Sequence, residues 1–112
     1  MNIQIFGMSK CFDTKKAERY FKERRIKYQY VGLLSKGLSR GEFASVMAAV
    51  GLKDMINTGI KEYKTLNMEH FGLRTTAEET LFNNPKLYRT PIVRNGRQAT
   101  VGYCPEIWAK WE

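Results

Sequence analysis

Cys11 is the residue best placed to do covalent chemistry, because two segments of different hydrophobic pattern meet around it. An apolar run over residues 3–7 precedes it, and apolar side chains at helical spacing over residues 17–25 follow it. The cysteine is therefore predicted on the turn between a strand and a helix. The first turn of a helix carries unpaired backbone N–H groups, which stabilise a thiolate and make the sulfur a better nucleophile. Lys10 adds positive charge beside it, although Cys11 as a small buried hydrophobic residue is the alternative interpretation.

The segments around Cys11 predict a strand, a helix and a second strand, in that order. The first strand covers residues 2–6, and the helix covers 14–25 with Asp13 or Thr14 as its cap. The second strand is expected over 26–34, where aromatic and β-branched side chains gather. Such a unit is right-handed with parallel strands, and its functional crevice lies beyond the carboxyl ends of the strands, which is where Cys11 falls.

The middle of the chain is predicted to be helical after a loop at residues 35–38. Ser39 and Glu42 have the spacing of a capping box, which opens a helix that Gly51 ends. Further predicted elements are helical pieces over 53–57 and 61–66, a linker at 71–73, and a helix opened by a capping box at 75–79 and ending at Asn83.

The last quarter of the chain predicts a β-hairpin followed by a helix. Strand-like residues 90–94 and 98–102 flank Asn95-Gly96, a strong hairpin signal, and Pro105 suits the first position of a last helix that carries Trp108 and Trp111. The predicted order is thus β-α-β, a helical insertion over about 38–84, then β-β-α. We interpret residues 1–112 as one α/β domain with a mixed four-stranded sheet, in the order of the thioredoxin fold.

Three further residues are candidates for a role beside Cys11. Thr90-Pro91 begins the third strand, where a cis bond would turn the backbone of Thr90 outward beside the cysteine, and a trans bond would merely begin the strand. Cys104 follows the fourth strand. It could resolve an oxidised Cys11 through an intramolecular disulfide, or it could be a spectator thiol.

Composition and charge exclude several classes of function. The formal charge of +8 comes from scattered basic residues that accompany no nucleic-acid-binding motif, so we expect a field that attracts anionic thiols or oxyanions rather than direct nucleic-acid binding. Two distant cysteines and one histidine, His70, suggest neither a disulfide framework nor a metal site. With no apolar run of about 20 residues and no signal peptide, we expect a cytoplasmic monomer without a membrane span.

Several motifs together resemble the ArsC/Spx family, glutaredoxin-like thioredoxin-fold proteins with a helical insertion. They are the spacing of Gly7, Cys11, Thr14, Lys16 and Ala17, the segment Pro91-Ile92-Val93, and the segment Val101-Gly102-Tyr103. The family contains arsenate reductases coupled to glutathione and glutaredoxin, and Spx-type transcriptional regulators. The resemblance implies a nucleophilic thiolate at Cys11 and a cis bond before Pro91.

The sequence also departs from both branches of this family. Arsenate reductases of this kind hold the oxyanion with three arginines, whose positions are taken here by Asn57, Thr90 and Tyr103. Arg89 lies one place earlier than the second of these and would point to the other face of an extended strand. Losing an arginine fork lowers oxyanion affinity, which puts specific arsenate reduction in doubt. Thr14 replaces the second cysteine of the Spx switch.

The sequence therefore predicts a thiol-dependent oxidoreductase of the arsenate reductase-like family, with Cys11 as its nucleophile. We expect glutathione, glutaredoxin or another redox protein as co-substrate or partner, and no bound cofactor. Thr90-Pro91 resembles the pair that contacts a peptide or glutathione backbone in thioredoxins and glutaredoxins. The residues expected to support the thiolate or the substrate are Lys10, Thr14, Arg89, Thr90 and Pro91. The alternative is a non-enzymatic, Spx-like transcriptional regulator that binds RNA polymerase.

Overall fold

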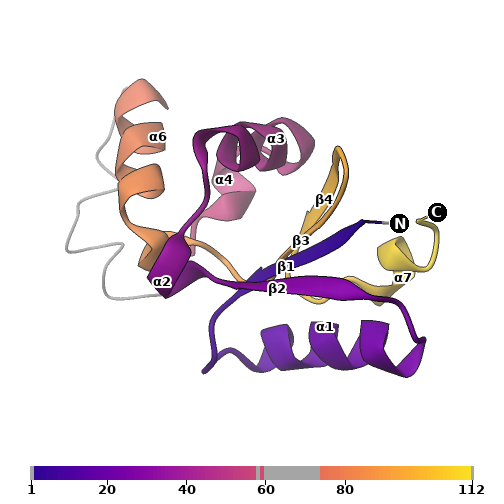
Figure 1. The fold of residues 1–112 in the computed structure, drawn as a ribbon. Coiled ribbons are helices and arrows are strands. Elements are labelled where there is room, and N and C mark those ends of the chain that lie inside the picture. Colours follow the sequence, from indigo (N-terminus) through magenta and orange to yellow (C-terminus); the bar gives the residue numbers. More distant parts are fainter. Residues whose placement is uncertain (1, 58, 60–73, 112) are drawn as a thin grey trace.

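The computed structural model describes residues 2–57, 59 and 74–111, and a mixed four-stranded sheet lies at its centre (Figure 1). Its strands are β1 (Ile3–Gly7), β2 (Tyr28–Gly32), β3 (Ile92–Asn95) and β4 (Gln98–Val101), in the spatial order β2-β1-β3-β4. β1 pairs parallel with β2 and antiparallel with β3, so that Ile5 stands between Tyr30 and Val93. The predicted α/β class and mixed sheet are confirmed.

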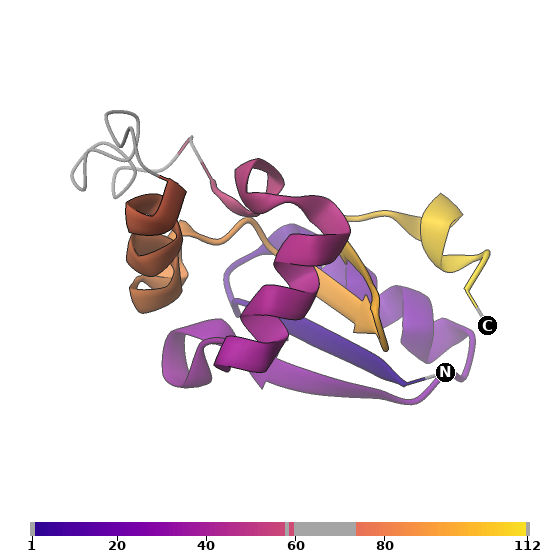
Figure 2. The same cartoon turned by 90° about the horizontal axis from the view of Figure 1, so that it is seen from above.

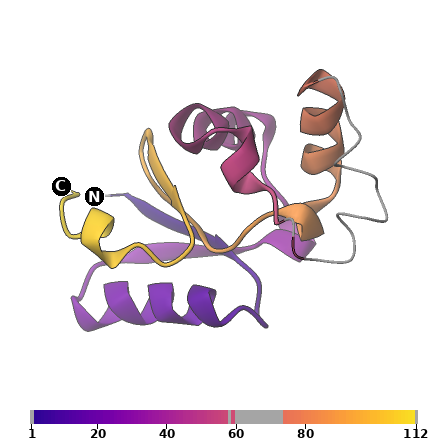
Figure 3. The same ribbon diagram turned by 180° about the vertical axis from the view of Figure 1, so that it is seen from behind.

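One face of the sheet packs against α1 (Phe12–Glu23) and α7 (Pro105–Trp108), which share a core with it. Figures 1 and 3 show α1 running alongside β2. Side chains alternate along a strand, and Ile3 and Ile5 of β1 point toward this layer. They pack against Phe21 and Trp108, which are almost wholly buried. Burying an aromatic side chain of this size contributes about 1.5–3 kcal/mol, so α1 is firmly held against the sheet.

The helices between β2 and β3 cover the opposite face, and Figure 2 shows α3 lying across the strands. Phe6 and Ile92 belong to this second core, together with Val46 of α3 and Leu81 of α6. The elements of this layer are α2 (Leu33–Lys36), α3 (Arg40–Val50), α4 (Leu52–Met55), α6 (Arg74–Asn83) and the 3₁₀ helix η2 (Pro85–Leu87). None of the helices in the described ranges is long and apolar enough to cross a bilayer.

The start of α3 confirms the predicted capping box. The Glu42 N–H donates to Ser39 Oγ at 3.1 Å, and the Ser39 N–H donates to Glu42 Oε1 at 2.9 Å. At the other end Gly51 has φ +85°, a left-handed conformation that glycine adopts without strain, and the helix ends there as predicted.

The start of α1 differs from the prediction. The helix begins at Phe12 with Cys11 as its N-cap, so Asp13 and Thr14 lie inside the first turn and neither caps it. The physical reason is that Thr14 is only 1% exposed and packs against Gly7 of β1, where its hydroxyl accepts from the Met8 N–H, so it serves the end of the strand and does not cap the helix.

Other boundaries also shift. The second strand was predicted to continue to residue 34, but it ends at Gly32. It ends there because Leu33 is buried in the core and opens α2, which occupies part of the loop predicted at 35–38. The helix ending at Asn83 begins at Arg74, so the capping box predicted from residue 75 is wrong. The predicted helical piece 61–66, the linker 71–73 and His70 lie outside the described residues.

The C-terminal hairpin and helix form where predicted, with a shifted turn. Asn95 pairs with Gln98, so the two turn residues are Gly96 and Arg97. Gly96 has φ +63° and Arg97 does not have a positive φ, which is the pattern of a type II′ turn with glycine first. Pro105 occupies the first turn of α7, but Trp111 lies beyond the end of this helix, where it is still buried.

Candidate active site

Cys11 lies between the end of β1 and the start of α1, at the position predicted from the sequence. Its N–H donates to the Met8 carbonyl at 3.0 Å, and its carbonyl accepts from the Lys15 N–H at 3.3 Å, the first hydrogen bond of the helix. The side chain is partly exposed, and the sulfur is a free thiol. The Cys11 backbone is thus held in place by hydrogen bonds, while its thiol remains accessible.

Hydrogen bonds to the sulfur favour its ionised form. Burial raises the pKa of Cys11, but the hydroxyls of Thr14 and Thr90 and the backbone N–H groups of Thr14 and Asp13 lower it, and the net pKa lies below that of an ordinary thiol. The Thr90 hydroxyl donates to Sγ at 3.0 Å. When the thiol is protonated, Sγ can instead donate to the Thr90 carbonyl at 3.7 Å. The hydrogen bonds around Cys11 therefore favour ionisation of its sulfur relative to an ordinary thiol.

Gly7 places Thr14 under the sulfur. A Cβ on Gly7 would lie 2.3 Å from Thr14 Cγ2 and 2.8 Å from its Oγ1, distances that no real contact allows. The Thr14 hydroxyl also accepts from the Met8 N–H at 3.5 Å. Glycine at the end of β1 thus makes room for a hydrogen-bond donor of Cys11, a role that the sequence indicated only through the family motif.

Thr90 reaches Cys11 from the segment that leads into β3. The Thr90–Pro91 peptide bond is cis, as the family resemblance implied. The Pro91 carbonyl accepts from the Gly102 N–H at 2.8 Å, which ties this segment to the end of β4. The structure therefore brings together three of the predicted site residues, Cys11, Thr14 and Thr90, across a long separation in sequence.

Two residues predicted to support the thiolate do not contact it. Lys10 is exposed, and neither it nor Arg89 is among the groups that set the pKa of Cys11. Arg89 instead lines a cavity of about 430 Å³ together with Cys104 and Asp54. This placement agrees with the expectation that Arg89 points away from the nucleophile.

Cys104 has the opposite electrostatic character to Cys11. Its thiol donates to the Val101 carbonyl at 3.4 Å, and the chain there forms the N-terminal end of α7. Burial raises the pKa of Cys104, the charges of Glu106 and Asp13 add to this effect, and the charge of Arg89 opposes it. We therefore expect Cys104 to react more slowly than Cys11 with thiol-modifying reagents at neutral pH.

Tyr30 is a neighbour of the site that sequence reasoning missed, because its place on β2 suggested only packing. Its pKa is raised by burial, by the charge of Glu18 and by the charge of Cys11. Tyr30 is 40% exposed, so part of this residue is open to solvent beside the site. Within the described ranges, no three histidine, cysteine, aspartate or glutamate side chains are grouped to hold a metal ion.

Comparisons with known proteins place this site in a broader context. The model of the ArsC family matches residues 6–111. The chain is 30% identical, over an alignment of 129 positions, to the global transcriptional regulator Spx 2 of Oceanobacillus iheyensis, covering 100% of this chain and 94% of the relative.

Solved structures show the same fold. The arsenate reductase from Vibrio cholerae superposes with a TM-score of 0.84 at 25% identity, over 96% of this chain and 94% of that one. The glutaredoxin-like protein NrdH-redoxin from Escherichia coli superposes with a TM-score of 0.52 at 12% identity, over 100% and 96% of the two chains. This second likeness is one of fold alone, and it confirms the thioredoxin-like arrangement.

Proposed function

The chain belongs to the ArsC family, and from this premise we propose that it is a thiol-dependent oxidoreductase with Cys11 as its nucleophile. The observation that carries the proposal is the 3.0 Å hydrogen bond from the Thr90 hydroxyl to the Cys11 sulfur, at the first turn of α1. Thiolate rather than thiol is the attacking species, and this geometry favours the thiolate.

The reaction that we propose is thiol–disulfide exchange with glutathione or a protein thiol. The Cys11 thiolate attacks one sulfur of a disulfide, a new S–S bond forms, and the other sulfur leaves as a thiolate that takes up a proton from water. A second thiol then attacks the mixed disulfide and releases the Cys11 thiolate. One such cycle releases one thiol of the substrate and leaves its other half joined to the external thiol as a new disulfide. A second cycle with another external thiol frees that half as a thiol and joins the two external thiols in one disulfide.

Thr90 contributes to this reaction in two ways. Its hydroxyl donates to the thiolate, and its carbonyl is the acceptor that the protonated thiol can use. Once Cys11 is ionised, that carbonyl becomes available to the N–H of a peptide or of glutathione. The residue that stabilises the nucleophile can therefore also orient a peptide-like partner.

Specific arsenate reduction is not the reaction that these residues favour. The positions of the three family arginines are occupied by Asn57, Thr90 and Tyr103, and Arg89 lies with Cys104. Asn57 is engaged locally, since its Oδ1 accepts from the Gly59 N–H at 3.1 Å. Among the described residues, no arginine is one of the groups that act on the sulfur, so a tetrahedral oxyanion lacks a bidentate partner from this part of the chain.

Mass spectrometry of the full chain after incubation with glutathione disulfide tests the proposal. We expect a glutathione adduct on Cys11 that disappears in Cys11→Ser and persists in Cys104→Ser. A Cys11–Cys104 disulfide would assign the resolving role to Cys104 instead of an external thiol. An unmodified Cys11 under conditions in which glutathione disulfide modifies a small reference thiol, such as N-acetylcysteine, would refute the oxidoreductase proposal.

Transcriptional regulation is a second candidate, because the Oceanobacillus iheyensis relative is named a global transcriptional regulator and aligns over the whole chain. The partner implied by the family resemblance is RNA polymerase. Thr14 stands where Spx regulators carry a second cysteine, so a switch by a vicinal disulfide is not available. If regulation is the function, purified polymerase is retained by the immobilised chain, and Cys11→Ser retains it equally well. Absence of any retained polymerase would eliminate this candidate.

A further inference from the structure

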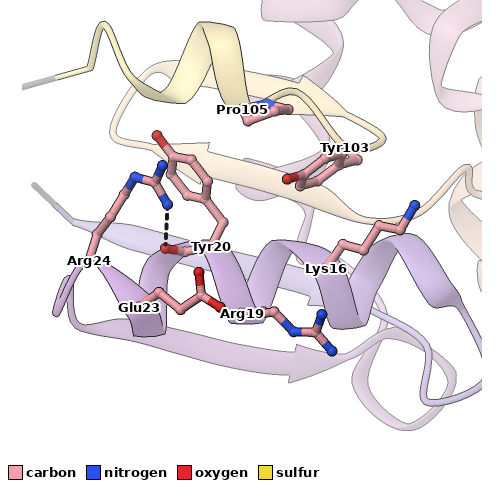
Figure 4. A pocket seen from close by; sticks show the side chains of 7 residues that line it. All are labelled: Lys16, Arg19, Tyr20, Glu23, Arg24, Tyr103 and Pro105. Atoms are coloured by element: carbon pink, nitrogen blue, oxygen red, sulfur yellow. Dashed lines mark hydrogen bonds between the residues drawn. The ribbon is translucent and has the colours of Figure 1, made fainter.

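A groove separate from the Cys11 sulfur runs along α1, beneath the segment that joins β4 to α7 (Figure 4). Its volume is about 460 Å³, enough for a few side chains of a bound polypeptide. The residues that line it are Lys16, Arg19, Tyr20, Glu23, Arg24, Tyr103 and Pro105. Because the α1 residues recur every three or four positions, they share one side of the helix.

Positive charge dominates this groove, with three cations against the single carboxylate of Glu23. In the part of the chain that the structure describes, the side-chain ion pair is between Arg40 and Glu79, on a different layer, so no carboxylate lies within ion-pair distance of the groove cations. Charges that the protein leaves unpaired remain available to an anionic ligand.

Aromatic rings hold two of these cations in place without neutralising them. The Arg24 guanidinium lies 3.8 Å from the centroid of the Tyr20 ring and donates to the Tyr20 carbonyl at 3.3 Å. Lys16 Nζ lies 5.7 Å from the centroid of the Tyr103 ring. A cation held over a ring keeps its full charge, and the restricted side chain loses less entropy when it binds an anion.

The lining favours a polypeptide over a nucleic acid. Glu23 would repel a continuous row of phosphates, whereas a peptide offers backbone N–H groups for it beside carboxylates for Lys16 and Arg19. Tyr103 is 42% exposed and presents a ring against which a side chain can pack. The groove thus combines charge, a hydrogen-bond acceptor and an apolar surface in a small volume.

We propose that this groove binds an acidic segment of a partner protein, with carboxylates paired to Lys16 and Arg19. The docking goes beyond the thiol chemistry and does not depend on it. Lys16 is five residues beyond Cys11, about 7–8 Å along the helix axis, so a segment in the groove also lies close to the nucleophile.

Fluorescence anisotropy with a labelled peptide of about ten residues, alternating glutamate and glycine around one tyrosine, tests this docking. The full chain carries Cys11→Ser, so that failure of the thiol proposal does not affect the result. We expect saturable binding that Lys16→Glu combined with Arg19→Glu weakens by about tenfold. The matched control, Lys53→Glu combined with Lys86→Glu, removes the same charge from exposed positions elsewhere and should stay within about twofold of the parent.

Two outcomes overturn the proposal. The first is equal loss of affinity in both double variants, which would mean attraction to net charge alone. The second is tighter binding of an oligothymidylate of matched length than of the peptide, which would assign the groove to nucleic acid. If the charge-reversed protein does not fold, Lys16→Gln combined with Arg19→Gln gives the same comparison without new carboxylates. Amide shifts in NMR spectra should map the peptide to residues 16–24 and 103.

Discussion

Replacing Thr90 with valine removes the hydroxyl that donates to the Cys11 sulfur at 3.0 Å and keeps the shape of the side chain. The carbonyl of residue 90 remains, so the protonated thiol keeps its acceptor. Only the thiolate loses a partner, and the pKa of Cys11 must rise. The change therefore separates stabilisation of the charged sulfur from access to it.

The expected magnitude follows from the strength of one hydrogen bond to a charged group. Such bonds contribute about 1.5–3 kcal/mol when buried, and solvent screening at this partly exposed sulfur reduces the figure to about 1 kcal/mol, or about fivefold in the fraction of thiolate. A more basic thiolate is intrinsically about twofold more nucleophilic. At a pH below the Cys11 pKa of both proteins, Cys11 of the Thr90→Val variant should thus react about two- to threefold more slowly than Cys11 of the parent. At a pH above both pKa values it should react about twofold faster.

The assay is the rate of alkylation by iodoacetamide as a function of pH, in a Cys104→Ser background that leaves one thiol. The two rate profiles should cross. Thr80→Val, a matched change in α6, should reproduce the parent profile. If the two rate profiles differ by the same factor at every pH, valine alters only the access of the reagent to Cys11. An unchanged Cys11 midpoint would refute the assigned role of the Thr90 hydroxyl.

Four further predictions concern the two thiols and the cores around them. Gly7→Ala should displace Thr14, destabilise the fold by about 1–3 kcal/mol in urea unfolding and raise the Cys11 midpoint. Phe21→Ala should cost about 3–5 kcal/mol, measured in the same way, because this ring is fully buried against α7. In Cys11→Ser protein, Cys104 should be alkylated with a midpoint above that of an ordinary thiol. Finally, in a Cys104→Ser background, the chain with Cys11 should gain stability over its Cys11→Ser variant as pH rises. The pKa of Cys11 is lower in the folded chain than in the unfolded one. The gain in free energy of unfolding therefore begins as pH rises through the pKa of the folded state, and it is complete above the pKa of the unfolded state.

Patterns along single elements were sufficient to predict much of the fold. The apolar run of β1, the capping box at Ser39 and Glu42, and the hairpin glycine all act over a few residues. The first two appear close to where they were predicted, and the hairpin forms with its turn shifted by one residue. Cys11 was found for the same reason, since a turn between a strand and a helix is a local feature.

What the sequence could not reveal depends on contacts between distant segments. Thr14 was predicted as a cap from its local preference, but its burial against Gly7 decides its place. Leu33 continued a strand-like run, yet the core on the α3 side draws it into a helix instead. The groove beside Tyr103 could not be predicted either, because α1 and the segment before α7 come together only in the folded chain.

In the function that we propose, the preparation of the nucleophile and the recognition of its partner reside largely in different residues of this chain. The first turn of α1 and Thr14 lower the pKa of Cys11 through hydrogen bonds that do not depend on the substrate. Recognition instead depends on residues at the rim, where Asn57 and Tyr103 take the places of family arginines. Thr90 belongs to both groups, because an arginine there would offer its charge to an oxyanion, whereas threonine offers its hydroxyl to the sulfur itself. We therefore propose that threonine at this position favours a stabilised thiolate over a bound oxyanion, and that the substrate is held by contacts outside the sulfur's own surroundings.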